Sequence, residues 1–126
     1  MFEVVTTGRL PSTAPVNGTV RAGHVIYSVQ VARDQTTGKT VDGGIEEQMR
    51  QTLKNLKQAI EAGGGTLKDV AQVIIYLVRK SDFDGMNKVY KEFFEQPYPS
   101  RATVIADLMG ENALVEIVAH AYGGNK

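Results

Sequence analysis

Two charged residues near the end of the chain could carry chemistry. Arg101 opens the apolar run RATVIA (101–106), and Glu116 lies within a second run, ALVEIVAHA (113–121). A guanidinium presents a planar pair of donors that matches a carboxylate, so Arg101 is a candidate binding group for a small carboxylate-bearing substrate. A glutamate beside it could position a water molecule or move a proton. The structural alternative is a cross-strand ion pair between the two, worth a few tenths to about 1 kcal/mol.

The side of the strand on which each residue lies decides whether the two can meet, because successive side chains of a strand alternate between its faces. Both runs predict strands. In the first, we expect the small apolar set to pack under helices, which turns Arg101 and Thr103 to the other face. In the second, the same reasoning turns Glu116 away from the helices. If segment 107–112 makes a hairpin of these strands, Arg101 and Glu116 approach one another. The set expected under the helices is Ala102, Val104 and Ala106.

Two helices are predicted to cover the strands. From Gly44 to Ala62 apolar residues recur at spacings of three and four, and a triple glycine follows at 63–65. This spacing is typical of one face of an amphipathic helix, and glycine readily takes the left-handed conformation that ends one. SDFD (81–84) resembles a capping box with Ser81 as the N-cap, so a second helix should begin there and end before Pro97.

The remaining segments predict further strands at 2–7, from about Thr19, at 24–32 and at 69–79. The last is nearly continuous and β-branched, which is typical of a central strand, with Ala71 and Val73 among the residues turned toward the helices. Strands and helices in this order predict an α+β fold with one sheet and both helices packed on one face. The other face is still too apolar for open water, which indicates an oligomer.

Composition narrows the class of protein. The chain has 126 residues, which predicts a single domain over 1–126. Its 14 acidic and 14 basic residues balance, so neither nucleic acid nor an anionic membrane is expected as the main partner. There is no cysteine, the two histidines lack nearby carboxylates at metal-ligand spacing, and no metal site is expected. The start of the chain does not resemble a signal peptide, which favours a soluble cytoplasmic protein.

The segment PSRATVIADLMGENALVEI (99–117) resembles the C-terminal signature of the RidA/YjgF family. That signature is a small residue or proline, an arginine, a short apolar strand and, after a loop, an aliphatic–Glu–Ile/Met triplet. The resemblance extends over GHVIYSVQVARDQTTGKTV (23–41) and over the helix, strand and helix in 45–94. It implies the chorismate-mutase-like fold, a single mixed sheet with two helices on one face. It also implies a homotrimer in which the three sheets form a central barrel with clefts between subunits.

The same resemblance implies an activity. Members with this arginine hydrolyse enamine and imine intermediates of the 2-aminoacrylate type to 2-oxo acids and ammonia, without a metal or organic cofactor. Carried over by position, Arg101 would bind the substrate carboxylate and the backbone of Thr103 would contact the nitrogen end. Glu116 would orient the attacking water and shuttle a proton. An imine carbon is already electrophilic, so a clamp, a positioned water and one acid or base suffice.

Departures from the family pattern leave other functions open. The family's GPY segment is APV here (14–16), so Val16 stands where an aromatic hydroxyl is expected. Its SGQ is SVQ (28–30), and Val29 replaces a glycine that lets backbone approach a ligand closely. Tyr27 or Tyr98 could supply the hydroxyl. The alternatives are a trimer that binds a small carboxylate or a partner protein without turnover, and a pathway-specific deaminase or hydrolase for a larger substrate.

Overall fold

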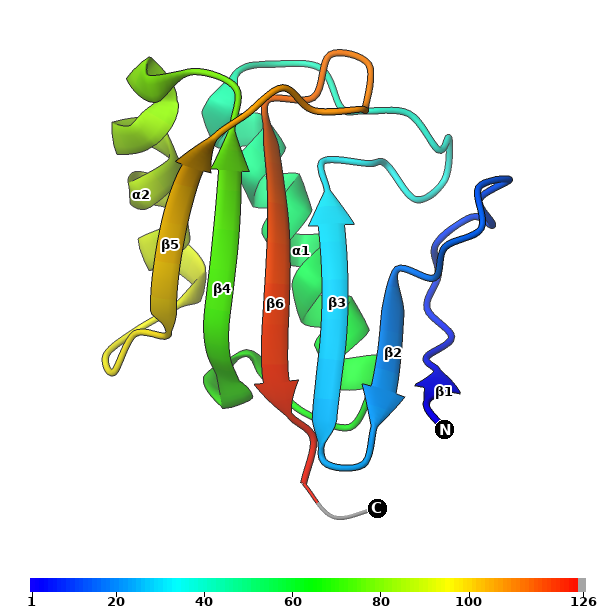
Figure 1. Cartoon of the computed structure of the whole chain (residues 1–126). Helices are drawn as coiled ribbons and strands as arrows, with labels where there is room; N and C mark the ends of the chain where they lie inside the picture. Colours follow the sequence, from blue (N-terminus) through cyan, green and yellow to red (C-terminus); the bar gives the residue numbers. More distant parts are fainter. Residues whose placement is uncertain (125–126) are drawn as a thin grey trace.

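The computed structural model describes residues 1–124 and contains one six-stranded sheet with α1 and α2 on the same face (Figure 1). The strand order is β1-β2-β3-β6-β4-β5. The strands are β1 (Glu3–Val4), β2 (Thr19–Ala22), β3 (Val25–Val31), β4 (Val70–Leu77), β5 (Ser100–Ile105) and β6 (Val115–Tyr122), and the helices are α1 (Ile45–Ala62) and α2 (Phe83–Phe93). Neither helix of the described chain is long and apolar enough to span a bilayer.

The first helix forms as its sequence predicts. At its start the Gly44 amide donates to the Glu47 carboxylate at 3.0 Å, which satisfies one of the unpaired N–H groups of the first turn. Its apolar positions, Met49 and Leu53 among them, are fully buried against the sheet. The helix ends at the triple glycine, where Gly64 has a φ of +101°, a conformation that favours glycine.

The second helix begins at Phe83 with Asp82 as its N-cap residue, one residue later than the capping box predicts. Lys80–Asp82 forms a separate short turn of 3-10 helix, and neither Ser81 nor Asp82 caps α2 through its side chain. The carboxylate of Asp82 instead accepts from Arg79 at 3.1 Å. The prediction of Ser81 as N-cap is therefore wrong, while the helix itself and its end before Pro97 are confirmed.

The hairpin expected between the last two strands does not form. β5 is an edge strand that pairs in parallel with β4, and β6 lies between β3 and β4, antiparallel to both (Figure 1). The physical reason is the helix between β4 and β5. Such a crossover connects parallel neighbours, so β4, α2 and β5 form one βαβ unit. After β5 the chain returns across β4, and β6 lies between β4 and β3.

This pairing reverses the expected faces of β5. Paired residues of parallel strands share a face, and Arg101 is the partner of Val73, which is completely buried under the helices. Arg101 and Thr103 therefore face α2, whereas Ala102 and Val104 point away and are exposed. The faces predicted for β5 are therefore wrong, because each residue lies on the face opposite to the one expected.

A similar correction applies at the start of β4. There a bulge between Val70 and Gln72 buries Val70 and leaves Ala71 exposed, so Ala71 does not face the helices as predicted.

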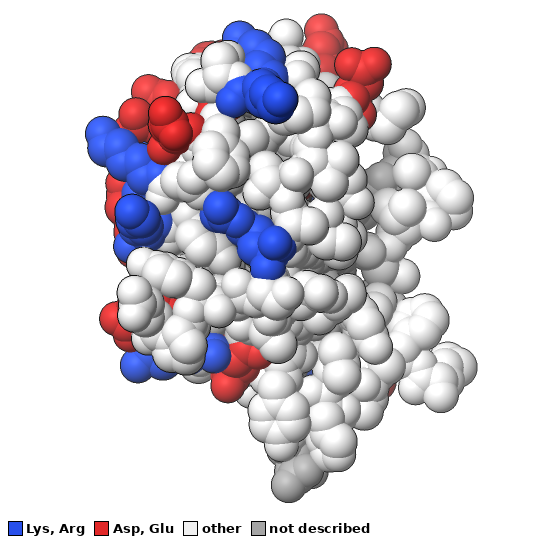
Figure 2. All heavy atoms as spheres, turned by 60° about the vertical axis from the view of Figure 1, so that its left-hand side comes forward, with Lys and Arg blue, Asp and Glu red and all other residues white. Residues whose placement is uncertain are grey.

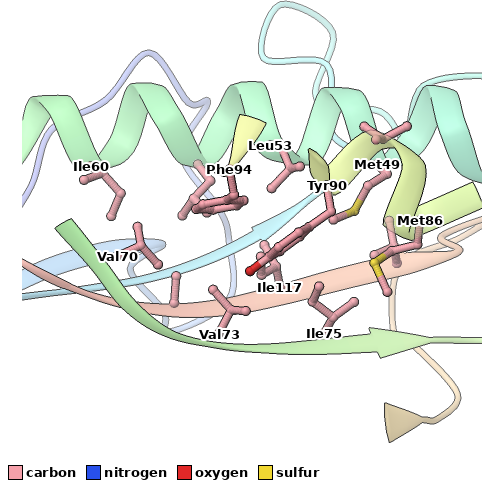
Figure 3. Close-up of a cluster of buried hydrophobic side chains, with 14 of the residues drawn as sticks. Met49, Leu53, Ile60, Val70, Val73, Ile75, Met86, Tyr90, Phe94 and Ile117 are labelled. Atoms are coloured by element: carbon pink, nitrogen blue, oxygen red, sulfur yellow. The ribbon is translucent and has the colours of Figure 1, made fainter. Parts of the chain in front are cut away.

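The core lies between the helices and the middle strands (Figure 3). Figure 3 shows the Tyr90 ring inserted between α2 and the sheet, with its hydroxyl end directed toward the strands. No helix of residues 1–124 covers the opposite face of the sheet, as Figure 1 shows, and Tyr27, Val29 and Val104 are each 40% exposed on it. The prediction of an apolar far face is confirmed.

Two buried polar residues of α1 hold the loops at one end of the sheet. Gln48 accepts from the Leu114 amide and donates to the Asn112 carbonyl, both at 2.8 Å, which fixes the loop before β6. Asn55 donates to the carbonyls of Val31 and Arg33 at 3.1 and 2.8 Å, which fixes the loop after β3. These contacts satisfy polar groups that would otherwise be costly to bury.

Candidate functional site

Arg101 lies half-buried beneath α2 and is held by aromatic rings. Its guanidinium carbon is 4.8 Å from the centroid of the Tyr90 ring and 5.8 Å from that of Phe83. Among the described residues its Nη1 donates only to the Met86 sulfur, a weak acceptor, at 3.8 Å. Within residues 1–124 no carboxylate lies within ion-pair distance of Arg101. The side chain is therefore positioned by cation–π contacts and keeps donors for an anion.

A pocket of about 480 Å³ opens beside this guanidinium. It is lined by Asn87, Tyr90, Lys91, Tyr98, Pro99 and Arg101. The basic groups of Lys91 and Arg101 and the side-chain amide of Asn87 are hydrogen-bond donors that match a small carboxylate. Figure 2 brings this side of the molecule forward and shows basic atoms near the middle, surrounded by uncharged surface.

The tyrosines of the pocket differ in their environment. Tyr90 is 5% exposed, and burial raises the pKa of its phenol, although the positive charge of Arg101 opposes that rise. Its hydroxyl has no hydrogen-bond partner among residues 1–124. Tyr98 is 44% exposed, and its ring centroid lies 6.3 Å from that of Tyr90. The sequence offered Tyr27 and Tyr98 as sources of the missing hydroxyl, and of these two Tyr98 is the one that lines the Arg101 pocket.

Thr103 lies two residues further along β5 and lines a second pocket of about 430 Å³. Phe83 joins the two regions, because it contacts Arg101 and also lines the Thr103 pocket. In the described part of the chain β5 is an edge strand, so half of its backbone N–H and C=O groups point outward. This edge offers backbone groups to a ligand that Arg101 holds.

The other predicted site residues lie on the far face of the sheet. Glu116 is half-buried there and pairs with Val31 of β3 and Tyr76 of β4. The Tyr27 ring packs edge-on against His120 at a centroid distance of 5.3 Å. The far-face position predicted for Glu116 is confirmed.

Val29 lies on the same face of the sheet as Glu116, whereas Val16 lies outside the sheet. Val29 stands opposite Val118, and its amide donates to the Gly18 carbonyl at 2.8 Å, so its backbone serves the sheet rather than a ligand. Val16 is 59% exposed in the loop before β2.

A single chain does not bring Arg101 and Glu116 together. β4 separates their strands, and their β4 partners, Val73 and Tyr76, are three residues apart. With ordinary strand spacings their Cα atoms are roughly 14 Å apart, and the two side chains point to opposite faces. The expectation that both share one face is wrong, and so is the cross-strand ion pair. The site residues form two groups: Tyr98, Arg101 and Thr103 at the β5 edge, and Tyr27, Val29 and Glu116 on the far face.

Sequence reasoning missed the residues of α2 that surround Arg101. Met86 and Tyr90 belong to an apolar stripe that is typical of the buried face of a helix. Asn87 directly follows Met86 in the sequence, and Lys91 directly follows Tyr90. A signal was present, because a strand–helix–strand order places the helix over both strands. No cluster of three or more potential metal ligands occurs in the part of the chain that the structure describes.

Comparison with known proteins defines the class. The model of the family described as endoribonuclease L-PSP matches residues 6–123. A RutC family protein of Pyrococcus horikoshii is 38% identical over 97% of this chain and 98% of its own. A 2-iminobutanoate/2-iminopropanoate deaminase of Dermatophagoides farinae is 34% identical over 91% of this chain and 91% of its own. The solved structure of E. coli TdcF with bound serine superposes with a TM-score of 0.86 at 26% identity, covering 95% and 98% of the two chains.

The fold is thus a single mixed sheet with two helices on one face, and it matches the fold of structural neighbours such as TdcF. The chain belongs to the endoribonuclease L-PSP family, which is the RidA/YjgF family.

Proposed function

We propose that this protein hydrolyses small reactive enamine and imine intermediates of the 2-aminoacrylate type to 2-oxo acids and ammonia. One observation carries the proposal: Arg101 is held over Tyr90 beside an open pocket, and no carboxylate of the described chain neutralises it. A relative of 34% identity named as an iminobutanoate/iminopropanoate deaminase supports the same chemistry.

The roles follow from the chemistry of each group. Arg101 binds the substrate carboxylate through paired N–H donors, and the outward backbone near Thr103 contacts the nitrogen end. Glu116 accepts a proton from the water that attacks the imine carbon and returns it to the departing nitrogen. The charge on Arg101 also favours the carboxylate form of the substrate over its neutral form.

Because Arg101 and Glu116 face opposite sides of one sheet, this mechanism needs two copies of the chain. We propose a homotrimer in which the far faces, with Tyr27 and Val104, pack around a common axis and bury their exposed apolar surface. Each cleft then takes Arg101, Thr103 and Tyr98 from one copy and Glu116 from its neighbour. Light scattering that gives a monomer would contradict this assembly.

The activity test is to generate 2-aminoacrylate with a pyridoxal-phosphate lyase and to follow the release of pyruvate. We expect the protein to accelerate release and Arg101→Met to lower kcat/KM by about a hundredfold, as for loss of a charged two-point contact. Arg50→Met is the matched control, because Arg50 is a surface residue paired with Glu92. No acceleration by the wild-type protein, or equal rates for the wild type and Arg101→Met, would overturn the proposal.

A binding module without turnover is the second candidate. It is favoured because Val29 replaces a glycine that would let the backbone approach a ligand, and because the Val29 amide already donates to the Gly18 carbonyl. Calorimetric titration with 2-oxobutanoate separates the two functions, because a module binds this acid but does not accelerate pyruvate release. Ribonuclease chemistry, which the family description names, is less well supported here, since the chain's acidic and basic residues balance at 14 each.

A further inference from the structure

A third pocket, which is rich in basic residues, lies beyond the end of β3, away from the Arg101 and Thr103 pockets. Its volume is about 610 Å³. It is lined by Arg9, Val31, Arg33, Gly38, Lys39, Thr40, Asp42, Gly110, Glu111 and Asn112. The mechanism proposed above uses none of its charged groups.

Two arginines of this pocket have unmet hydrogen-bonding capacity. Arg33 donates from Nε to the Gly38 carbonyl at 3.1 Å, but its Nη1 is buried without a partner in residues 1–124. Burial, together with the nearby charge of Arg33, lowers the pKa of Arg9. Two guanidiniums that repel one another and share a concave site favour an anion between them.

The carboxylates of the pocket do not supply that anion. Asp42 and Glu111 are exposed, whereas both arginines are partly buried. Within residues 1–124 neither Arg9 nor Arg33 has a carboxylate within ion-pair distance. The two arginines are therefore more deeply placed than the two carboxylates, while Lys39 is exposed like them.

The position of Arg33 is fixed by its surroundings. Asn55 of α1 binds the Arg33 carbonyl at 2.8 Å, and Arg33 also forms a β-bridge with Thr40. The Thr40 hydroxyl donates to the Glu111 carbonyl at 3.0 Å and so joins the two loops that form the walls. A site whose backbone is held in this way loses little conformational entropy when it binds a ligand.

The pocket shares Val31 with the strand pair that carries Glu116. Val31 is the cross-strand partner of Glu116, and Arg33 follows it after a tight turn in which the Arg33 amide donates to the Val31 carbonyl at 2.8 Å. We infer that Arg33 and Arg9 bind a second carboxylate of the substrate, so that the preferred substrates are imines of dicarboxylic acids. This inference rests on the proposed function, because it places the imine carbon at Glu116 and the first carboxylate at Arg101 of a neighbouring copy.

Calorimetric titration tests the inference with two stable acids, 2-oxoglutarate with two carboxylates and 2-oxobutanoate with one. We expect the wild-type protein to bind 2-oxoglutarate at least about tenfold more tightly. Arg33→Gln should remove that preference and leave the affinity for 2-oxobutanoate unchanged. Arg9→Gln, on a separate segment, should have the same selective effect, whereas the exposed control Lys54→Gln should change neither affinity.

Several results would overturn the inference: equal affinities of the wild type for both acids, an equal loss of both in Arg33→Gln, or inorganic phosphate binding more tightly than 2-oxoglutarate. Turnover is measured separately, with imines made by amino-acid oxidases from glutamate and from 2-aminobutanoate. No turnover of either imine with selective binding intact would refute the proposed function alone. Turnover of both imines without selectivity would refute this inference alone.

Discussion

The separation of Arg101 and Glu116 within one chain allows a test by subunit mixing. Arg101→Met removes the guanidinium, while an unbranched side chain still packs against Tyr90. Glu116→Gln removes the carboxylate charge with little change of shape. If each cleft takes Arg101 from one copy and Glu116 from the next, every cleft is defective in a trimer of either variant. A mixed trimer contains clefts in which both residues are intact.

The size of the effect follows from random assembly. In an equal mixture, a cleft receives an intact Arg101 in about half of the cases and an intact Glu116 from the neighbour in about half, so about one quarter of clefts are complete. We expect the mixture to recover about a quarter of the wild-type rate, while each variant alone keeps about 1% or less. The two proteins are unfolded in guanidinium chloride, mixed and refolded, and pyruvate release is followed with lactate dehydrogenase.

A second mixture sharpens the test. The double variant, with Arg101→Met and Glu116→Gln in one chain, is refolded with an equal amount of wild type. About one quarter of the wild-type rate is expected for clefts shared between copies, and about one half for a site within one chain. Each protein refolded alone is the control. If the single variants mix into trimers and no activity returns, the assignment of the two residues to neighbouring copies is refuted.

Three further predictions concern stability and titration. Arg21 is 5% exposed and donates to four backbone carbonyls, so Arg21→Met should lower the free energy of unfolding by about 3 kcal/mol in urea titrations, and an unchanged midpoint would contradict this. Tyr90→Phe removes a buried hydroxyl without a partner in residues 1–124 and should raise stability by about 1 kcal/mol, whereas a loss would mean that the hydroxyl is bonded. The amides of Thr37 and Thr36 lower the pKa of Asp34. The stability that this carboxylate contributes is therefore present above its unfolded pKa and lost as pH falls through the lower folded pKa, so wild type and Asp34→Ala should converge in acid.

Much of the fold is predictable from local patterns. The period of α1 and the triple glycine fix its bounds almost to the residue, and the β-branched run of β4 identifies a central strand. Pairing depends on parts of the chain far apart in sequence, and there the sequence pattern was misleading. Two strands joined by a short segment resemble a hairpin, but β6 gains more by lying between β3 and β4, where Val115 and Ile117 are fully buried.

The candidate site was predictable as residues but not as an arrangement. The types of Arg101 and Glu116 indicate a carboxylate clamp and a proton carrier. The faces of β5 could not be assigned from polarity, because an arginine whose aliphatic stem packs under a helix beside aromatic rings looks like a surface residue in sequence. The Arg33 pocket was not predictable at all, since it needs the loops after β3 and before β6 to meet.

Gln48 and Asn55 are seven residues apart on α1, which is close to two turns, so both project from the same side of the helix and their contacts are about 10 Å apart along its axis. The spacing between the loop that carries Arg33 and the loop that precedes Glu116 is thus set by helix pitch. One residue inserted between Gln48 and Asn55 would rotate one of them by about 100° and detach its loop. Length changes in the 34–38 turn would leave both contacts in place. Related sequences should therefore vary in length at that turn and keep a constant count between these two positions.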